Sequence, residues 1–188
     1  DTLSLHDGSS DLIVVVTGLG NQGNTDTHTE GVLEQNGDVK TIELKVSPLE
    51  KNLTFEIWCR KPDKVSLSMV SPSGEIIEKI PAKLKNFEKI NLVFEGSKVG
   101  VEYLLPEEIT GDELIRITIE DIREGIWQFK LIGDFIIDGR FDAWLPQRPL
   151  IEEGTRFLNS SPFTTLETPS TSRGILCCSY YNQNNNSM

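Results

Sequence analysis

The sequence has few basic residues, few cysteines and no long hydrophobic run. Its 18 Lys and Arg residues stand against 29 Asp and Glu residues, which gives a formal net charge of −11. Because a surface rich in carboxylates repels phosphate, we expect no nucleic-acid partner. The longest apolar run, residues 12–16, is too short to span a bilayer, and no signal-peptide pattern opens the chain, so we expect no membrane partner.

The three cysteines, Cys59, Cys177 and Cys178, do not form a disulfide framework. Two of them are adjacent, and no Cys-x-x-Cys spacing typical of a zinc site is present. Free cysteines are usually buried, so we expect all three to be buried thiols in strands.

Composition divides the 188 residues into three zones. Residues 1–30 contain a short apolar strand and a polar loop, residues 31–147 a long series of β-type segments, and residues 148–188 a return segment rich in Pro, Ser and Thr. With 37% hydrophobic residues, the chain can bury a sizeable core. We expect disorder only in the last segment, residues 182–188, which reads NQNNNSM.

The middle zone has the alternation of antiparallel β-strands. Segments such as KTIELKV, LTFEIWC and KVSLSMV alternate with a period of two, and further segments occur at intervals of about ten residues. In ELIRITIE, for example, Ile115, Ile117 and Ile119 alternate with Arg116 and Thr118. No amphipathic helix pattern interrupts the series. The sequence therefore predicts a β-sandwich of jelly-roll type over residues 31–147.

The segment LIVVVTGLGNQG, residues 12–23, contains a Gly-x-Gly-x-x-Gly pattern directly after an apolar strand. In a dinucleotide-binding site the last glycine opens a helix, and a βαβ unit comes next. Here the next residues, NTDTHTEGVL, lack the apolar spacing of a helix. No Gly-Lys-Ser/Thr of a P-loop occurs either. We therefore expect no nucleotide at this loop, and no cofactor.

The asparagine in this loop suggests different chemistry. A strand that ends in Gly-Asn-x-Gly can present an asparagine amide as a hydrogen-bond donor to a developing oxyanion. In this chain that asparagine is Asn21, between Gly20 and Gly23.

Two motifs at opposite ends of the chain resemble subtilisin-like serine proteases. VVVTGLGNQGN (residues 14–24) is similar to the family's strand and Gly-Asn-Glu-Gly loop, with Gln22 in place of the usual Glu. FTTLETPSTSRGILCCSYYNQNN (residues 163–185) resembles the segment in which a Pro-containing loop enters a strand written Val-Ile-Thr-Val-Gly-Ala. The stretch of residues 141–169 resembles the segment after the inserted β-sandwich in the clostridial spore-germination Csp proteases.

This resemblance implies a jelly-roll domain that interrupts an α/β catalytic domain, whose neighbouring strands form the two flanks. Asn21 would be the oxyanion-hole residue, and Gly20, Gly23 and His28 would lie in the substrate loop. The implied partners are the rest of the catalytic domain and a propeptide or protein substrate, in a bacterial protein that is spore-associated or secreted. A dimer through exposed edges of the flank strands is also expected.

The catalytic triad of this family is missing from the chain. The family has its histidine in a His-Gly-Thr-His context and its serine in Gly-Thr-Ser, whereas this chain has only His6 and His28, in other contexts. The segment EGTRF has Arg156 where the serine would stand. We therefore expect this chain alone to be inactive, and the whole protein to be a serine endopeptidase or a pseudoprotease that acts as a sensor in spore germination.

His28 allows two interpretations. It could act beside Asn21 in the substrate loop, or it could be a solvated loop histidine, which we favour because no partner is visible in the sequence. His6 receives no functional assignment.

An alternative function is a non-catalytic module that binds glycan or protein through a face of the sandwich. Trp58 and Trp127 fall within apolar alternating strands, so we expect both in the core, whereas Trp144 is the candidate for an exposed, binding aromatic. Asp134, Asp138 and Asp142 are spaced by four, and carboxylate oxygens of this kind could form a calcium site. Because the EF-hand pattern is missing, we predict no metal.

Overall fold

The computed structural model describes residues 14–20, 22–84, 86–165, 170–172 and 174–179. The chain divides into two compact units: Gln22–Thr165, and a second unit formed by the chain ends, Asp1–Asn21 with Leu166–Met188. Among the described residues there is no α-helix, and the one helical turn is the 3₁₀ helix η1, Gln22–Asn24. The expected disorder of residues 182–188 lies outside the described residues.

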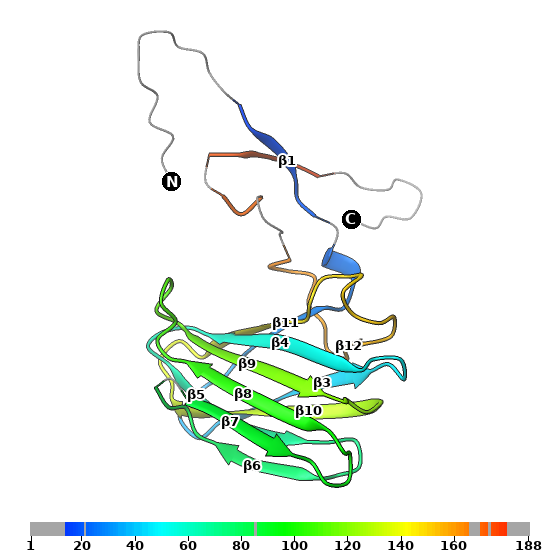
Figure 1. Cartoon of the computed structure of the whole chain (residues 1–188). Coiled ribbons are helices and arrows are strands. Elements are labelled where there is room, and N and C mark those ends of the chain that lie inside the picture. The colour runs from blue at the N-terminus through cyan, green and yellow to red at the C-terminus, as the bar shows by residue number, and fades with distance from the viewer. Residues whose placement is uncertain (1–13, 21, 85, 166–169, 173, 180–188) are drawn as a thin grey trace. The chain divides into compact units, whose positions relative to one another are not determined.

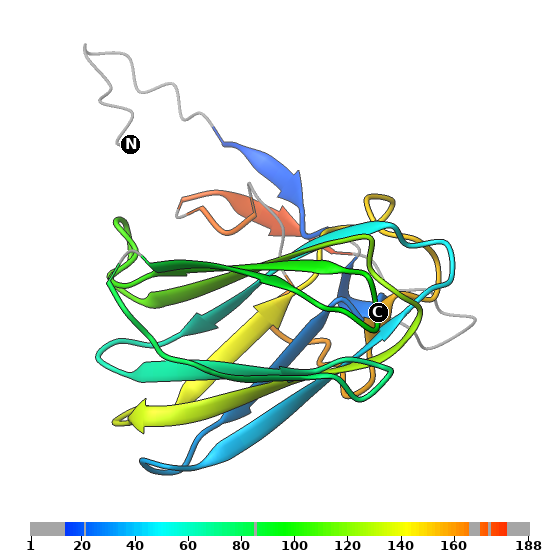
Figure 2. The ribbon, with the colours of Figure 1, turned by 60° about the horizontal axis from the view of Figure 1, so that its bottom comes forward.

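The larger unit is a sandwich of two antiparallel sheets, which confirms the predicted fold class (Figures 1 and 2). The six-stranded sheet has the order β2 (His28–Val32), β11 (Arg140–Trp144), β4 (Asn52–Cys59), β9 (Glu113–Glu120), β8 (Lys98–Leu104) and β7 (Asn86–Asn91). The five-stranded sheet has the order β12 (Arg156–Phe157), β3 (Val39–Val46), β10 (Gly125–Phe135), β5 (Lys64–Val70) and β6 (Ile76–Ile80).

This unit is longer at both ends than the range 31–147. At its start β2 pairs with β11, and at its end β12 pairs with β3, so residues of both expected flanks complete the sandwich. Such pairings join segments more than a hundred residues apart and leave no mark in local composition.

The core lies between the two sheets and agrees with the strand alternation. Phe55 of β4 packs edge-on against Phe129 of β10, with ring centroids 4.9 Å apart, and against Phe157 of β12. All three rings are buried. The alternation of β9 is confirmed as well, since its isoleucines face the core. Burial of these side chains away from water is the main stabilising contribution to such a fold.

Tyr103 places a polar group inside this core. Its hydroxyl accepts the backbone N–H of Leu67 at 3.0 Å and donates to the carbonyl oxygen of Ile80 at 2.8 Å. Tyr103 belongs to β8, while its partners belong to β5 and β6 of the other sheet. Burial raises the pKa of this hydroxyl well above its usual value, so it stays a donor at any physiological pH. Tyr103 therefore links the two sheets through hydrogen bonds.

Replacing Tyr103 with phenylalanine should lower the free energy of unfolding by about 1–3 kcal/mol, because the Leu67 N–H is left buried without its acceptor. Urea denaturation at neutral pH measures this loss. Thr118→Val is the control, since it removes a hydroxyl whose hydrogen bond to Thr54 is exposed on the outer face of the same sheet. Equal losses in both variants would contradict a special role for the Tyr103 bridge.

The structure corrects one tryptophan expectation and confirms another. Trp127 is fully buried, as expected, and its indole N–H donates to the carbonyl oxygen of Arg123 at 2.9 Å. The expectation that Trp58 lies in the core is wrong. Ile57 and Cys59 face the core, so Trp58 between them points to the outer face of the six-stranded sheet, where it is half-buried.

The smaller unit contains one pair of short strands among its described residues, β1 (Val16–Gly18) and β13 (Leu176–Cys178). They pair in parallel, in the register Val16↔Leu176 to Gly18↔Cys178. The prediction that the two flanks are neighbouring strands is therefore confirmed. The whole sandwich lies between these two paired strands in the sequence.

The cysteine expectation holds for one residue of three. Cys59 is buried in the core of the sandwich, but Cys177 is half-buried and Cys178 is exposed. Both lie in β13, whose described sheet has only β1 beside it, so little apolar surface is available to cover them.

Candidate functional site

The glycine loop lacks the geometry of a dinucleotide site. Gly20 has a φ of 90°, in the region that favours glycine. Beyond it the chain forms the single turn η1 and then β2, where a dinucleotide site would have a long α-helix. Gly23 lies beside Thr165. Asn21 is outside the described residues, so its oxyanion role stays a prediction.

His28 is not a solvated loop residue, and that interpretation is wrong. It is the first residue of β2 and is buried, because β11 pairs alongside and residues near Ser161 lie against it. Its Nδ1 donates to the carbonyl oxygen of Ser161 at 3.2 Å, and its Nε2 lies 3.0 Å from Oδ1 of Asp142. The Thr164 hydroxyl contacts both Nε2 and Asp142, at 3.2 and 3.3 Å. A carbonyl oxygen can only accept, so Nδ1 is the donor toward Ser161.

Trp144 stacks on His28, with ring centroids 5.0 Å apart and an interplanar angle of 28°. The structure thus brings together two of the residues singled out in the sequence, His28 and Trp144. Trp144 is half-buried on the outer face of the six-stranded sheet, and its role in binding stays a prediction. The stacked histidine holds one side of its indole ring in place.

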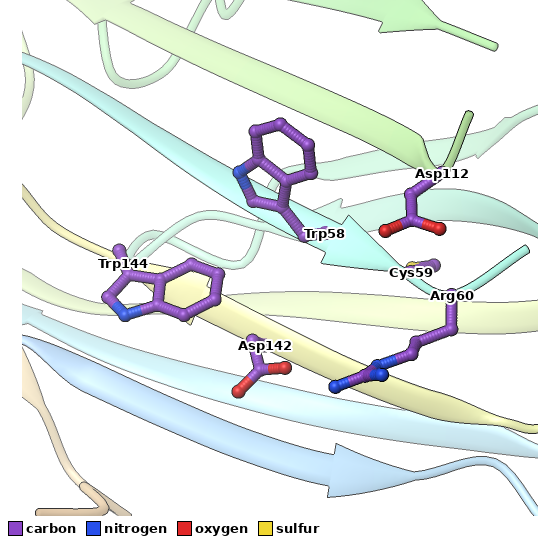
Figure 3. Close-up of a pocket in the computed structure, with 6 residues that line it drawn as sticks. All are labelled: Trp58, Cys59, Arg60, Asp112, Asp142 and Trp144. Carbon is purple, nitrogen blue, oxygen red and sulfur yellow. The ribbon is translucent and has the colours of Figure 1, made fainter. Parts of the chain in front are cut away.

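Beside Trp144 the outer face has a hollow with a volume of about 360 Å³ (Figure 3). Its lining comes from β4 and the residue after it, from β11 and from the residue before β9, and consists of Trp58, Cys59, Arg60, Asp112, Asp142 and Trp144. The Cys59 side chain itself is buried on the core side, and burial raises the pKa of its thiol well above its usual value. Cys59 is therefore no nucleophile for this hollow. The chemistry of the hollow is that of two indoles, two carboxylates and a guanidinium.

Hydrogen bonds along the sheet face hold Trp58 in its orientation. Its indole N–H donates to Oε2 of Glu56 at 3.2 Å. Arg116 binds the other oxygen of Glu56 at 3.1 Å and reaches Glu102 at 2.9 Å with its second arm. Glu56, Arg116 and Glu102 are direct neighbours across β4, β9 and β8. No local pattern in the sequence indicates this row of three charged side chains, because only the pairing of the strands brings them together.

The three aspartates weighed as a calcium site do not share one. Asp134 binds Ser66 and Lys79. Asp138 pairs with Arg140, whose hydrogen bond to the carboxylate lowers the pKa of Asp138 to about 2. Asp142 pairs with His28. In the part of the chain that the structure describes, no three His, Cys, Asp or Glu residues are grouped to hold a metal ion.

Within the described residues, the structure contains no helix that could span a bilayer. No protein-family model and no curated protein matches the sequence. Among solved structures, the Clostridium perfringens CspB protease is similar, with 26% sequence identity and a TM-score of 0.79. The match covers 93% of this chain and 36% of that protein, so this chain spans little more than a third of its structural relative.

Proposed function

We propose that this chain is part of a subtilisin-like serine endopeptidase of the Csp type and carries its oxyanion loop and an inserted jelly-roll domain. The observation that carries the proposal is the similarity to the CspB protease. The match covers 93% of this chain, which is more than the sandwich unit Gln22–Thr165, so it includes residues of the flanks as well. Both motif-bearing flanks of the sequence support the same relationship.

The parallel pair of β1 and β13 gives independent support. Purely antiparallel domains contain no parallel strand pairs, whereas α/β domains are built on parallel sheets. Here the sandwich Gln22–Thr165 lies between two strands that are direct neighbours. That arrangement is expected of a domain inserted between adjacent strands of a catalytic α/β core.

In the proposed mechanism Asn21 donates its side-chain amide N–H to the oxyanion of the tetrahedral intermediate. The nucleophile and base come from the rest of the catalytic domain, because neither histidine of this chain stands in the family's catalytic context. His28 is enclosed within the sandwich unit and bound to Asp142 and Ser161. We extend the proposal to the partners: a propeptide or protein substrate, in a spore-associated or secreted bacterial protein.

The first test is labelling of the full-length protein with a fluorophosphonate probe, which reacts with the activated serine of serine hydrolases. The full-length protein should be labelled, while this chain alone should not. A folded, mature full-length protein that takes no label would contradict the protease assignment and favour a pseudoprotease.

Asn21→Ala in the full-length protein should lower kcat by about 10²–10³, the usual effect of losing one oxyanion donor, and leave KM nearly unchanged. Cleavage of a chromogenic peptide gives both constants. Asn24→Ala, in the same loop, is the matched control and should retain full kcat. If Asn21→Ala also retains full kcat, Asn21 is not the oxyanion donor.

A further inference from the structure

The hollow on the outer face of the six-stranded sheet combines features that no protease role uses. Two tryptophans, Trp58 and Trp144, line it from neighbouring strands (Figure 3). In the sheet register Trp58 is opposite Asp142 and Trp144 is opposite Glu56, so the two indoles are diagonal neighbours on one face. Both indoles are half-buried, so each keeps part of its ring and its polar N–H accessible on this face, as aromatic residues at binding surfaces often do.

We propose that this hollow is a binding site for a neutral saccharide, in which a sugar ring stacks on the indoles of Trp144 and Trp58. The site lies entirely within the sandwich unit and does not depend on the protease function proposed above.

The charges around the hollow select the class of ligand. The carboxylates of Asp112 and Asp142 repel a phosphate or another anion, whereas the guanidinium of Arg60 repels a free cation. Together these side chains offer both hydrogen-bond acceptors and hydrogen-bond donors. A ligand that needs both and carries no charge is a polyhydroxyl compound. Vicinal hydroxyl groups can donate to a carboxylate and accept from a guanidinium at the same time.

The indoles supply the apolar part of the recognition. A pyranose ring presents C–H groups on one face, and these pack on the electron-rich face of an aromatic ring. The hollow has a volume of about 360 Å³, near the lower end of the range of small-molecule sites, roughly 300–1,000 Å³. It therefore has room for a ligand of one or two sugar rings.

The lining side chains are held in place before any ligand binds. Trp144 rests on the buried ring of His28, and His28 also fixes the Asp142 carboxylate. Trp58 is anchored to Glu56 through its indole N–H. Asp112 accepts the backbone N–H of Lys61 at 3.1 Å. A site with fixed rotamers loses less conformational entropy on binding, which favours even a shallow hollow.

The test uses the indole N–H signals of the three tryptophans in the NMR spectrum of the whole 188-residue chain. Cellotriose, maltotriose and triacetylchitotriose are titrated separately to millimolar concentration. At least one should shift the signals of Trp58 and Trp144 in a saturable way. The signal of Trp127 should stay in place, because that side chain is buried in the core and its N–H is bound to Arg123. The third tryptophan is thus an internal control that needs no mutation.

Variants then locate the site. Trp144→Ala and Trp58→Ala should each weaken binding by roughly tenfold or more, as expected for aromatic anchors at the centre of a site. Phe87→Ala is the matched control and should bind as the unmodified chain does, because Phe87 is an exposed aromatic residue of β7, at the opposite edge of the same sheet. Arg60→Ala provides a second variant with little risk to folding, since Arg60 is exposed after the end of β4.

Two results would overturn the proposal. One is the absence of saturable shifts at Trp58 and Trp144 with all three trisaccharides, together with no binding on an array of neutral glycans. The other is binding that survives Trp144→Ala and Arg60→Ala while thermal unfolding shows both variants to be folded. Neither result depends on whether the full-length protein reacts with the fluorophosphonate probe.

Discussion

Asp63→Ala should lower the free energy of unfolding by about 3–5 kcal/mol, since one buried and two partly buried N–H groups lose their acceptor, and a buried N–H without an acceptor costs about 1–3 kcal/mol. The Asp63 side chain is buried, and Oδ1 accepts the backbone N–H groups of Ile137 and Asp138, at 2.7 and 3.1 Å. Oδ2 accepts the N–H of Gly139 at 2.5 Å. One carboxylate thus satisfies three consecutive backbone donors.

The position of Asp63 explains why the effect should be large. It lies in the turn where the chain leaves β4 for β5 and so passes from one sheet to the other. Its three donors lie in the turn where the chain returns from β10 to β11. Gly139 in that second turn is also fixed sterically, because a Cβ there would collide with the carbonyl oxygen of Leu33. Alanine at position 63 therefore releases a junction between the two sheets.

Urea denaturation at neutral pH measures the effect through tryptophan fluorescence, to which the buried Trp127 contributes. Asp63→Asn should fall between the wild type and Asp63→Ala, because the amide keeps one acceptor oxygen but turns a donor toward an N–H. Asp138→Asn is the matched control, since its carboxylate belongs to the same junction but faces solvent and pairs with Arg140. An Asp63→Ala variant as stable as Asp138→Asn would show that water replaces the carboxylate without cost.

The alternation of residues along single strands predicted more of this structure than any other signal. Leu53, Phe55 and Ile57 of β4 all face the core, as their period of two indicates. The same alternation puts Trp58 on the outer face, because its neighbours Ile57 and Cys59 face the core. The signal that places Trp58 and Trp144 on the same outer face was therefore present in the sequence.

The contacts of His28 could not be predicted in the same way. Its partners Asp142 and Ser161 are more than a hundred residues away in the sequence, and they reach it only because β11 pairs with β2 and a later segment lies against both. No local pattern specifies which strands become neighbours in an antiparallel sandwich. That the two flanks are neighbouring strands was predicted from the resemblance to a family, since strands of three residues carry too little pattern of their own.

Glu113 should make the protein less stable as the pH rises from about 4.5 to about 8. It is the first residue of β9, and its side chain is fully buried. Oε2 accepts the backbone N–H of Val65 at 2.7 Å, while Oε1 has no hydrogen-bond partner among the described residues. Burial, and to a lesser degree the nearby Asp134 and Asp63, raise the pKa of this carboxyl to about 8.

The sign of the effect is set by proton binding. Below pH 4.5 the carboxyl is protonated in both the folded and the unfolded state, so its ionisation does not affect stability. Between pH 4.5 and about 8 the unfolded state loses its proton first, and unfolding becomes more favourable with rising pH. Above the folded-state pKa both states are ionised and the loss of stability has reached its full size, about 3–5 kcal/mol for a shift of this magnitude.

Glu113→Gln should remove this pH dependence and make the chain more stable than the wild type above neutral pH. Glutamine has nearly the same shape, keeps an oxygen to accept the Val65 N–H and carries no charge at any pH. Glu120→Gln, at the exposed far end of the same strand, is the control for the loss of one negative charge. The informative quantity is the difference in unfolding free energy between variant and wild type, measured by urea denaturation from pH 5 to pH 9. Titrating groups that do not interact with Glu113 contribute equally to both proteins, so a difference that stays constant over this range would show that Glu113 does not titrate there.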